Sequence, residues 1–274
     1  GRSSYNRSSV EFDVAGALSF EVLGSDNDPV ANVDWSPILL ALEEKTGLKA
    51  LSVDMYNSMN ESLCTAMQNG LGMNETIEIL ELNHAPLCDD NADLWCRAFS
   101  FLRTNKALKS LLVNLKHVVT ESCLSAFRLG IAAILQDNAS LESITIQSVT
   151  KIEAKDYLAF ITALQGNSTL KTLSLTYGRF RSTVKLQLTD DEDKRILSLL
   201  KNSYSLECLP SIHLEAGDVG AILRLNEAGR RYLIDGSSIS KGVEVLGRVN
   251  NDINCVFLQL LENPRLCDRS AVEK

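Results

Sequence analysis

The segment Asn138-Ala-Ser-Leu141-Glu-Ser-Ile144-Thr-Ile146 carries the pattern that decides the fold, an L-x-x-L-x-L motif with isoleucine in its last two apolar places. Near-copies of this motif begin 29 to 36 residues apart along most of the chain. The first apolar residues of the copies are Ala15, Leu48, Ile77, Leu108, Leu141, Leu170 and Leu206. Recurrence at this spacing is typical of repeat proteins, in which each unit stacks on the next.

Each copy combines two periodicities. Leu51 and Val53 alternate with polar residues, as in a strand with one buried face. The longer segments between the strands carry apolar residues at helical spacing, for example Leu124, Phe127 and Ile131. Successive strands joined by helices must run parallel. We therefore predict an α/β solenoid, or horseshoe, with parallel strands on its concave face and helices on its convex face.

The junction from each helix to the next strand also repeats. Asn105, Asn138 and Asn167 all lie in the pattern L-x-x-N-x-x-L, and Asn74 and Asn202 take the same place with variations. Asparagine tolerates the left-handed backbone conformation that ends a helix. We expect these asparagines to adopt it.

The units resemble leucine-rich repeats of the ribonuclease-inhibitor type over about residues 15–214, and the junctions resemble repeat families of unicellular algae. The resemblance implies a strand-and-helix horseshoe. Members of the family usually have Asn or Cys eight places after the first leucine, where its side chain bonds the loop backbone. Those places hold Tyr56, Ala85, Lys116, Val149 and Gly178 here, so the loops must be held in another way.

The repeats are flanked by two different segments. Residues 1–14 are expected to form a terminal strand or a frayed end. Residues 215–274 lack the motif and contain three predicted helices at about 221–233, 239–249 and 253–261. A solenoid needs such a helical C-terminal cap over the exposed end of its core. The start at Gly1, without an initiator Met, suggests a fragment of a longer protein.

Several helix boundaries can be predicted from capping residues. Ser36-Pro37 should begin a helix over 38–46 that Gly47 ends. Thr120 should cap the helix that reaches Leu135, and Thr189 with Glu192 should form a capping box. A further helix at about 61–68 is expected to be followed by a loop at 70–72.

Composition excludes several functions. The net charge is −8, which argues against a surface for nucleic acid or for anionic membranes. No run of eighteen apolar residues could span a bilayer. The seven cysteines form no close pairs, which favours reduced thiols in the cytoplasm or nucleus over zinc or disulfides. We expect a monomer without metal or cofactor.

No catalytic motif accompanies the repeats. The three histidines show no metal-binding spacing, and a Cys–His pair would have to be assembled by folding. The acidic residues 190–193 fit the first turn of a helix, where the helix dipole favours them. The basic segment 178–188 is either a contact site or a solvated loop. We predict that the chain is not an enzyme.

The residue after each first apolar place alternates in charge. These residues are Lys49, Glu78, Lys109, Glu142, Lys171 and Glu207. Stacked strands lie about 4.8 Å apart, so each lysine should lie between glutamates of neighbouring units. The alignment predicts that all six form one row.

The predicted function is a scaffold that binds a protein or peptide on the concave face. The outward residues should be those at the third, fifth, seventh and eighth places of each unit, and none of them is Lys or Arg. We expect a basic segment near Asp54 and Glu81, and apolar anchors at Leu112, Leu115 and Tyr177. The complete predicted contact set is Asp54, Glu81, Asn83, His84, Leu112, Asn114, Leu115, Thr145, Gln147, Ser174, Thr176 and Tyr177.

Two alternatives remain open for this face and for the chain. The strands could be polar only because water covers them. The chain could also be a regulatory subunit, either a substrate adaptor of a ubiquitin ligase or a regulator of small GTPases, with its flanking domains absent.

Overall fold

A sheet runs through the computed structural model, which describes residues 8–13, 17–22, 36–41, 47–55, 59–87, 91–118, 120–148, 154–177, 189–209, 218–230, 239–249 and 252–262. The strands follow one another in the sheet in the order of the chain. They are β1 (Ser8–Asp13), β2 (Ala17–Val22), β3 (Ala50–Asp54), β4 (Ile79–Leu87), β5 (Ser110–Val118), β6 (Ser143–Ser148) and β7 (Thr172–Tyr177). β1 pairs antiparallel with β2, and every later pair is parallel.

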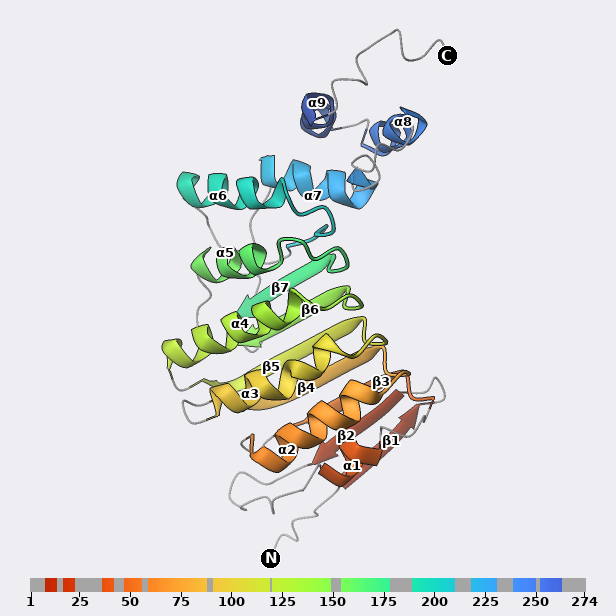
Figure 1. Ribbon diagram of the computed structural model, residues 1–274, viewed down its shortest axis with the longest axis vertical. Coiled ribbons are helices and arrows are strands. Elements are labelled where there is room, and N and C mark those ends of the chain that lie inside the picture. The colour runs from red at the N-terminus through yellow and green to blue at the C-terminus, as the bar shows by residue number, and fades with distance from the viewer. Residues whose placement is uncertain are drawn as a thin grey trace, which may run out of the picture.

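Helices connect the parallel strands and stack beside them in chain order. They are α1 (Ser36–Ala41), α2 (Glu61–Ala66), α3 (Ala92–Ala98), α4 (Glu121–Leu135), α5 (Ala154–Ala163) and α6 (Asp190–Leu200). A π-helical segment, η1 (Met67–Leu71), extends α2, and a 3-10 segment, η2 (Phe99–Arg103), extends α3. Figure 1 shows these helices stacked in chain order along one side of the sheet. The predicted α/β architecture, with a parallel sheet and helices, is confirmed.

The strand register confirms the alignment of the repeats. Leu51 lies opposite Leu80, and Leu80 lies opposite Leu111. Ile144 then pairs with Leu111 on one side and with Leu173 on the other. An isolated bridge between Thr172 and Cys208 continues the same register into the copy that begins at Leu206. Equivalent places of every aligned copy therefore lie side by side.

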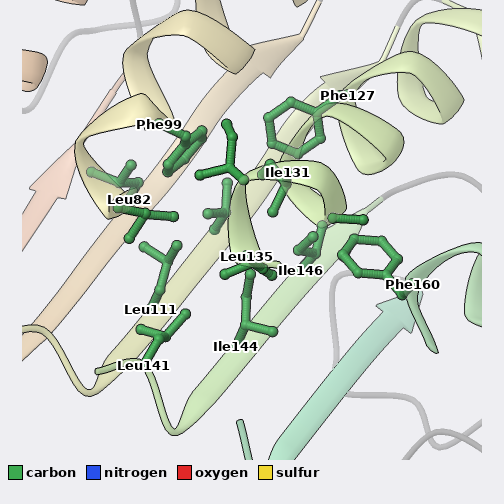
Figure 2. Close-up of a cluster of buried hydrophobic side chains, with 14 of the residues drawn as sticks. Leu82, Phe99, Leu111, Phe127, Ile131, Leu135, Leu141, Ile144, Ile146 and Phe160 are labelled. Carbon is green, nitrogen blue, oxygen red and sulfur yellow. The ribbon is translucent and has the colours of Figure 1, made fainter. Parts of the chain in front are cut away.

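The core lies between the sheet and the helices. Strand residues such as Leu111 and Ile144 and helix residues such as Phe127 and Ile131 are fully buried. Figure 2 shows these side chains meeting in one layer that continues from unit to unit. Neither layer could bury its apolar side alone, which is why the units stack.

Three helices follow the last unit: α7 (Asp218–Ala228), α8 (Ile239–Arg248) and α9 (Ile253–Glu262). Val219, Ile222 and Leu223 of α7 join the core of the repeats. Behind them, Leu225 and Val245 belong to a second, smaller cluster. α7 thus covers the C-terminal end of the core, and α8 and α9 lie beyond it (Figure 1).

The prediction for the junction asparagines is wrong in mechanism. Among the described residues other than glycine, only His84 has a positive φ. Asn74, Asn105, Asn138 and Asn167 are instead buried, and their side chains form the hydrogen bonds of the junctions. In Asn167, Oδ1 accepts hydrogen bonds from the backbone N–H groups of Thr169 and Leu170 at 3.0 and 2.8 Å. Its Nδ2 donates to the carbonyls of Leu135 and Asn138 in the preceding unit at 2.8 and 2.9 Å.

The same bonds recur along the stack and form an asparagine ladder. Asn105 Nδ2 donates to the carbonyls of Leu71 and Asn74. Asn138 Nδ2 donates to the carbonyl of Leu102. Each amide satisfies the end of one helix and the start of the next strand, so an asparagine at this place ties two units together.

The ladder changes composition at the last unit. Asn202 is exposed, and Ser203 takes the buried place that we assigned to Asn202. Ser205 Oγ donates to the Asn167 carbonyl at 2.9 Å. Asn226 of α7 then donates to the carbonyls of Ser203 and Leu206 at 2.8 and 2.7 Å. α7 is therefore attached to the last unit by the same kind of bond that joins the units themselves.

In units that lack the Asn or Cys usual in the resembled family, side chains from helices and their N-caps bond the backbone of strands β4 and β7. Trp95 Nε1 and Asn91 Nδ2 both donate to the Pro86 carbonyl, at 3.1 and 3.2 Å. The buried Tyr157 hydroxyl donates to the Leu175 carbonyl at 3.1 Å and accepts from the Leu175 N–H at 3.0 Å.

The predicted caps at Thr120 and Thr189 are confirmed, because Thr120 Oγ1 accepts from the Cys123 N–H and Thr189 and Glu192 form a capping box. Gly47 has a φ of 70°, but residues 42–46, which lead up to it in the predicted helix, lie outside the described residues. The predicted loop at 70–72 is wrong, because Gly70 lies within η1. A Cβ at Gly70 would lie 1.8 Å from the Leu39 carbonyl oxygen, so glycine allows α1 to pack directly against this helical turn.

Some predictions concern residues that the structure does not describe. These residues are the basic segment 178–188, Cys88 and Cys267. The described cysteines, Cys64, Cys96, Cys123, Cys208 and Cys255, are not joined by disulfides.

Candidate functional site

The candidate site is the face of the sheet that points away from the helices, which we call the open face. Its side chains come from the third, fifth and seventh places of each unit, because the fourth and sixth point into the core. Glu81, Asn83, Leu112, Asn114, Thr145, Gln147 and Thr176 are all partly exposed there, as predicted.

The prediction for the eighth place is wrong. Leu115 has no exposed surface and belongs to the core, as do Met55 and the buried Ser148 in neighbouring units. The strands keep their two-residue alternation beyond the sixth place, so the eighth place returns to the inner face. Leu115 is therefore not an anchor for a partner.

His84 is the exception at the eighth place. Leu82 pairs with Val113 and Ala85 pairs with Leu115, so β4 contains one more residue than β5 between these pairs. This β-bulge places His84 in the left-handed region, with a φ of 57°. The alternation shifts by one residue, so that the bulge leaves His84 partly exposed and Ala85 fills the core.

Three further predicted contact residues have other outcomes. Ser174 lies on the expected face but is only 6% exposed, so it offers little surface to a partner. The side chains of Asp54 and Tyr177 are outside the described part of the structure, although the backbones of both belong to strands.

Ile79 is an exposed apolar residue of the open face that is missing from the predicted contact set. It occupies an outward place but was not selected as a contact residue. Its side chain is 44% exposed at the start of β4, next to Ser110 of β5. A large apolar residue at the third place, where the other units have Ala, Ser, Thr or Cys, was the available signal.

A row of alternating charges borders the open face where the strands begin. The backbone N–H of each residue in the predicted row bonds the carbonyl of the residue before it in the row, from Lys49 to Glu207. Glu78 binds Lys49 Nζ at 2.8 Å and Lys109 Nζ at 2.7 Å, and Glu142 binds Lys171 Nζ at 2.6 Å. The predicted row is confirmed.

The row changes the acidity of its members. Hydrogen bonds from Lys109 and Lys49 lower the pKa of Glu78 from 4.5 to about 2. The hydrogen bond and the charge of Glu78 in turn raise the pKa of Lys109, and the charge of Glu142 adds to the effect. These side chains are already paired, which distinguishes them from the carboxylate of Glu81 on the open face.

Other kinds of site were sought in the described segments. They contain no group of three or more His, Cys, Asp or Glu side chains placed to hold a metal ion. None of their helices is long and apolar enough to cross a membrane.

The sequence matches no protein-family model, and it matches no curated protein. Two solved structures are similar in part. Actin-binding site 2 of leiomodin-1 is 17% identical over 85% of this chain and 98% of that chain, with a TM-score of 0.32. The C-terminal domain of a Caenorhabditis elegans tropomodulin is 13% identical over 74% of this chain and 99% of that chain, with a TM-score of 0.34. Likenesses this weak carry no argument about the site.

Proposed function

We propose that this chain is a leucine-rich-repeat solenoid of the ribonuclease-inhibitor type, and that it binds a polypeptide partner on the open face instead of catalysing a reaction. The common register of the units and the asparagine ladder support a regular solenoid. Neighbouring strands lie about 4.8 Å apart and packed helices about 8–10 Å apart, so a stack of such units curves with the sheet on the inside. The open face is then concave.

The observation that carries the proposal is the composition of the open face. From β3 to β7 it presents partly exposed hydroxyl and amide side chains, with Ile79 and Leu112 among them. Polypeptide interfaces combine apolar anchors with a polar surround in this way. The proposed protein is monomeric. We place it in the cytoplasm or nucleus, because its seven cysteines form no close pairs in the sequence.

Two matched substitutions test the face. Peptides are first selected on the immobilised chain from a random library displayed on phage. Thr145→Arg places a large side chain in the middle of the open face, and Ala126→Arg places the same side chain on the exposed surface of α4. We expect Thr145→Arg to weaken binding of the selected peptides more than tenfold, which is about 1.4 kcal/mol, and Ala126→Arg to leave it unchanged.

Both variants should melt at the wild-type temperature, because neither position is in the core. Loss of binding in Ala126→Arg with normal binding in Thr145→Arg would move the site to the helices and overturn the proposal.

A further inference from the structure

Glu81 is a carboxylate without a counter-charge on the open face. Its side chain is partly buried at the fifth place of β4. Within the described part of the chain it takes part in no hydrogen bond or ion pair, whereas Glu78 and Glu142 are both held by lysines. A carboxylate that loses more water when a partner binds must gain a compensating charge.

Apolar side chains flank this carboxylate. Leu112 of β5 lies directly opposite Glu81 in the register, at the spacing of neighbouring strands. Ile79 lies two residues before Glu81, on the same face and 44% exposed. Glu81 therefore has an apolar side chain across the ladder and another before it on its own strand. Its other two neighbours on this face are Ser52 of β3 and Asn83, which bond each other.

We propose that Ile79, Glu81 and Leu112 form a subsite for one lysine or arginine side chain of the polypeptide partner. The aliphatic stem would pack on Leu112 and Ile79, and the cationic head would reach the Glu81 carboxylate. Long basic side chains combine an apolar stem with a charged end, which is the combination that this patch presents. The inference rests on the proposed function, because it specifies which partner side chain the open face recognises.

The pairing is strengthened by its surroundings. Apolar side chains on two sides exclude water, and a lower local dielectric makes an ion pair stronger than on an open surface. A neutral partner side chain would cover the carboxylate and leave it uncompensated. The subsite therefore selects against neutral peptides as well as for basic ones.

The peptides selected on the wild-type chain provide the probe. We expect lysine or arginine at one position of the selected peptides. Glu81→Gln should weaken their binding about fivefold and reduce its dependence on salt. Replacing the peptide lysine by norleucine, or an arginine by citrulline, should weaken binding to the wild-type chain by a similar factor and should have little further effect on Glu81→Gln.

The stem is tested separately. Diaminopropionic acid keeps the ammonium group of lysine but shortens the stem, and Leu112→Ala removes the surface on which the stem packs. We expect these two changes to be coupled, so that together they weaken binding by less than the product of their separate effects. Glu81→Lys should bind peptides in which the basic residue is replaced by glutamate.

The outcomes separate the subsite from the proposed function. If Thr145→Arg abolishes binding but the peptides lack a basic residue, or Glu81→Gln binds them normally, the subsite is wrong and the open face remains the binding surface. If Thr145→Arg also has no effect, both ideas are overturned. Unchanged melting temperatures of Glu81→Gln and Leu112→Ala ensure that lost binding reflects the site.

Discussion

Arg128 Nη1 lies 2.6 Å from Asp156 Oδ2, and the two side chains are only 2% and 3% exposed. Arg128 belongs to α4 and Asp156 to α5, so this buried ion pair joins the helices of two consecutive units. Taking two charges out of water is costly, and the pair persists only while each charge has the other.

Breaking this pair should destabilise the fold strongly. Asp156→Asn leaves a buried guanidinium without its counter-charge, and we expect a loss of about 3–5 kcal/mol in the free energy of unfolding. Urea denaturation would measure it. The double variant Arg128→Met, Asp156→Leu should recover most of that loss, because an apolar pair has no charge to desolvate. A single variant within about 0.5 kcal/mol of wild type would contradict this view of the pair.

The asparagine ladder predicts an unequal effect at two asparagines. Asn167→Ala should cost about 3 kcal/mol, since it leaves two carbonyls and two N–H groups without their buried partners. Asn202→Ala is the matched control, because Asn202 is exposed and should change stability by less than about 0.5 kcal/mol. Both are measured by chemical denaturation. Equal losses would show that the ladder does not depend on buried amides.

The row of charges predicts that the stability of the fold depends on pH in the acidic range. The pKa of Glu78 is about 2 in the folded chain, against 4.5 for an unperturbed group. A lowered pKa means that Glu78 contributes stability above about pH 4.5, and that this contribution is lost as pH falls towards 2. Titration of its carboxyl carbon by NMR should give a midpoint well below those of unpaired glutamates.

Salt provides the control for that measurement. Lys49, Glu78 and Lys109 lie at the surface, where salt screens their charges. Added salt should therefore raise the pKa of Glu78 towards its usual value. Lys49→Met and Lys109→Met should each raise it as well. A midpoint that stays near 4.5 in all three proteins would mean that the ion pairs do not form in solution.

The bulge predicts that glycine and alanine at position 84 differ in their effect on the stability of the fold. Glycine adopts a φ of 57° without strain, whereas alanine does so at a cost of roughly 1 kcal/mol. His84→Gly and His84→Ala both remove the imidazole, so their difference reports the backbone. We expect the glycine variant to be about 1 kcal/mol more stable in urea denaturation. If the alanine variant is the more stable, the left-handed bulge is absent in solution.

Local patterns of the sequence were sufficient for the phase of strands β3 to β7 up to the sixth place of each unit. The alternation in segments such as Leu51–Val53 decides which side chains enter the core, and copies of similar length then place equivalent residues opposite one another. The alternating row from Lys49 to Glu207 followed from the same alignment. The alignment also identified Glu81 and Leu112 as outward residues, because the direction of a side chain follows from the alternation within its own strand.

Three features were decided only by the tertiary structure. The role of Asn167 could not be derived from its own junction, because the carbonyls that it binds lie about thirty residues earlier, in the preceding unit. The pairing of Arg128 with Asp156 depends on how two helices pack. The bulge at His84 depends on the pairing of β4 with β5, and it shifts the alternation of β4 so that His84 is partly exposed and Ala85 is buried.

The physical reason is the same in all three cases. A single unit of the sequence determines its own periodicity, which is a property of neighbouring residues along the chain. Which polar groups meet between units depends on their distance in space, and that distance exists only after stacking. The sequence by itself therefore determined the repeat, the strand phase and the charged row, whereas stacking decided the asparagine ladder, the buried ion pair and the true composition of the open face.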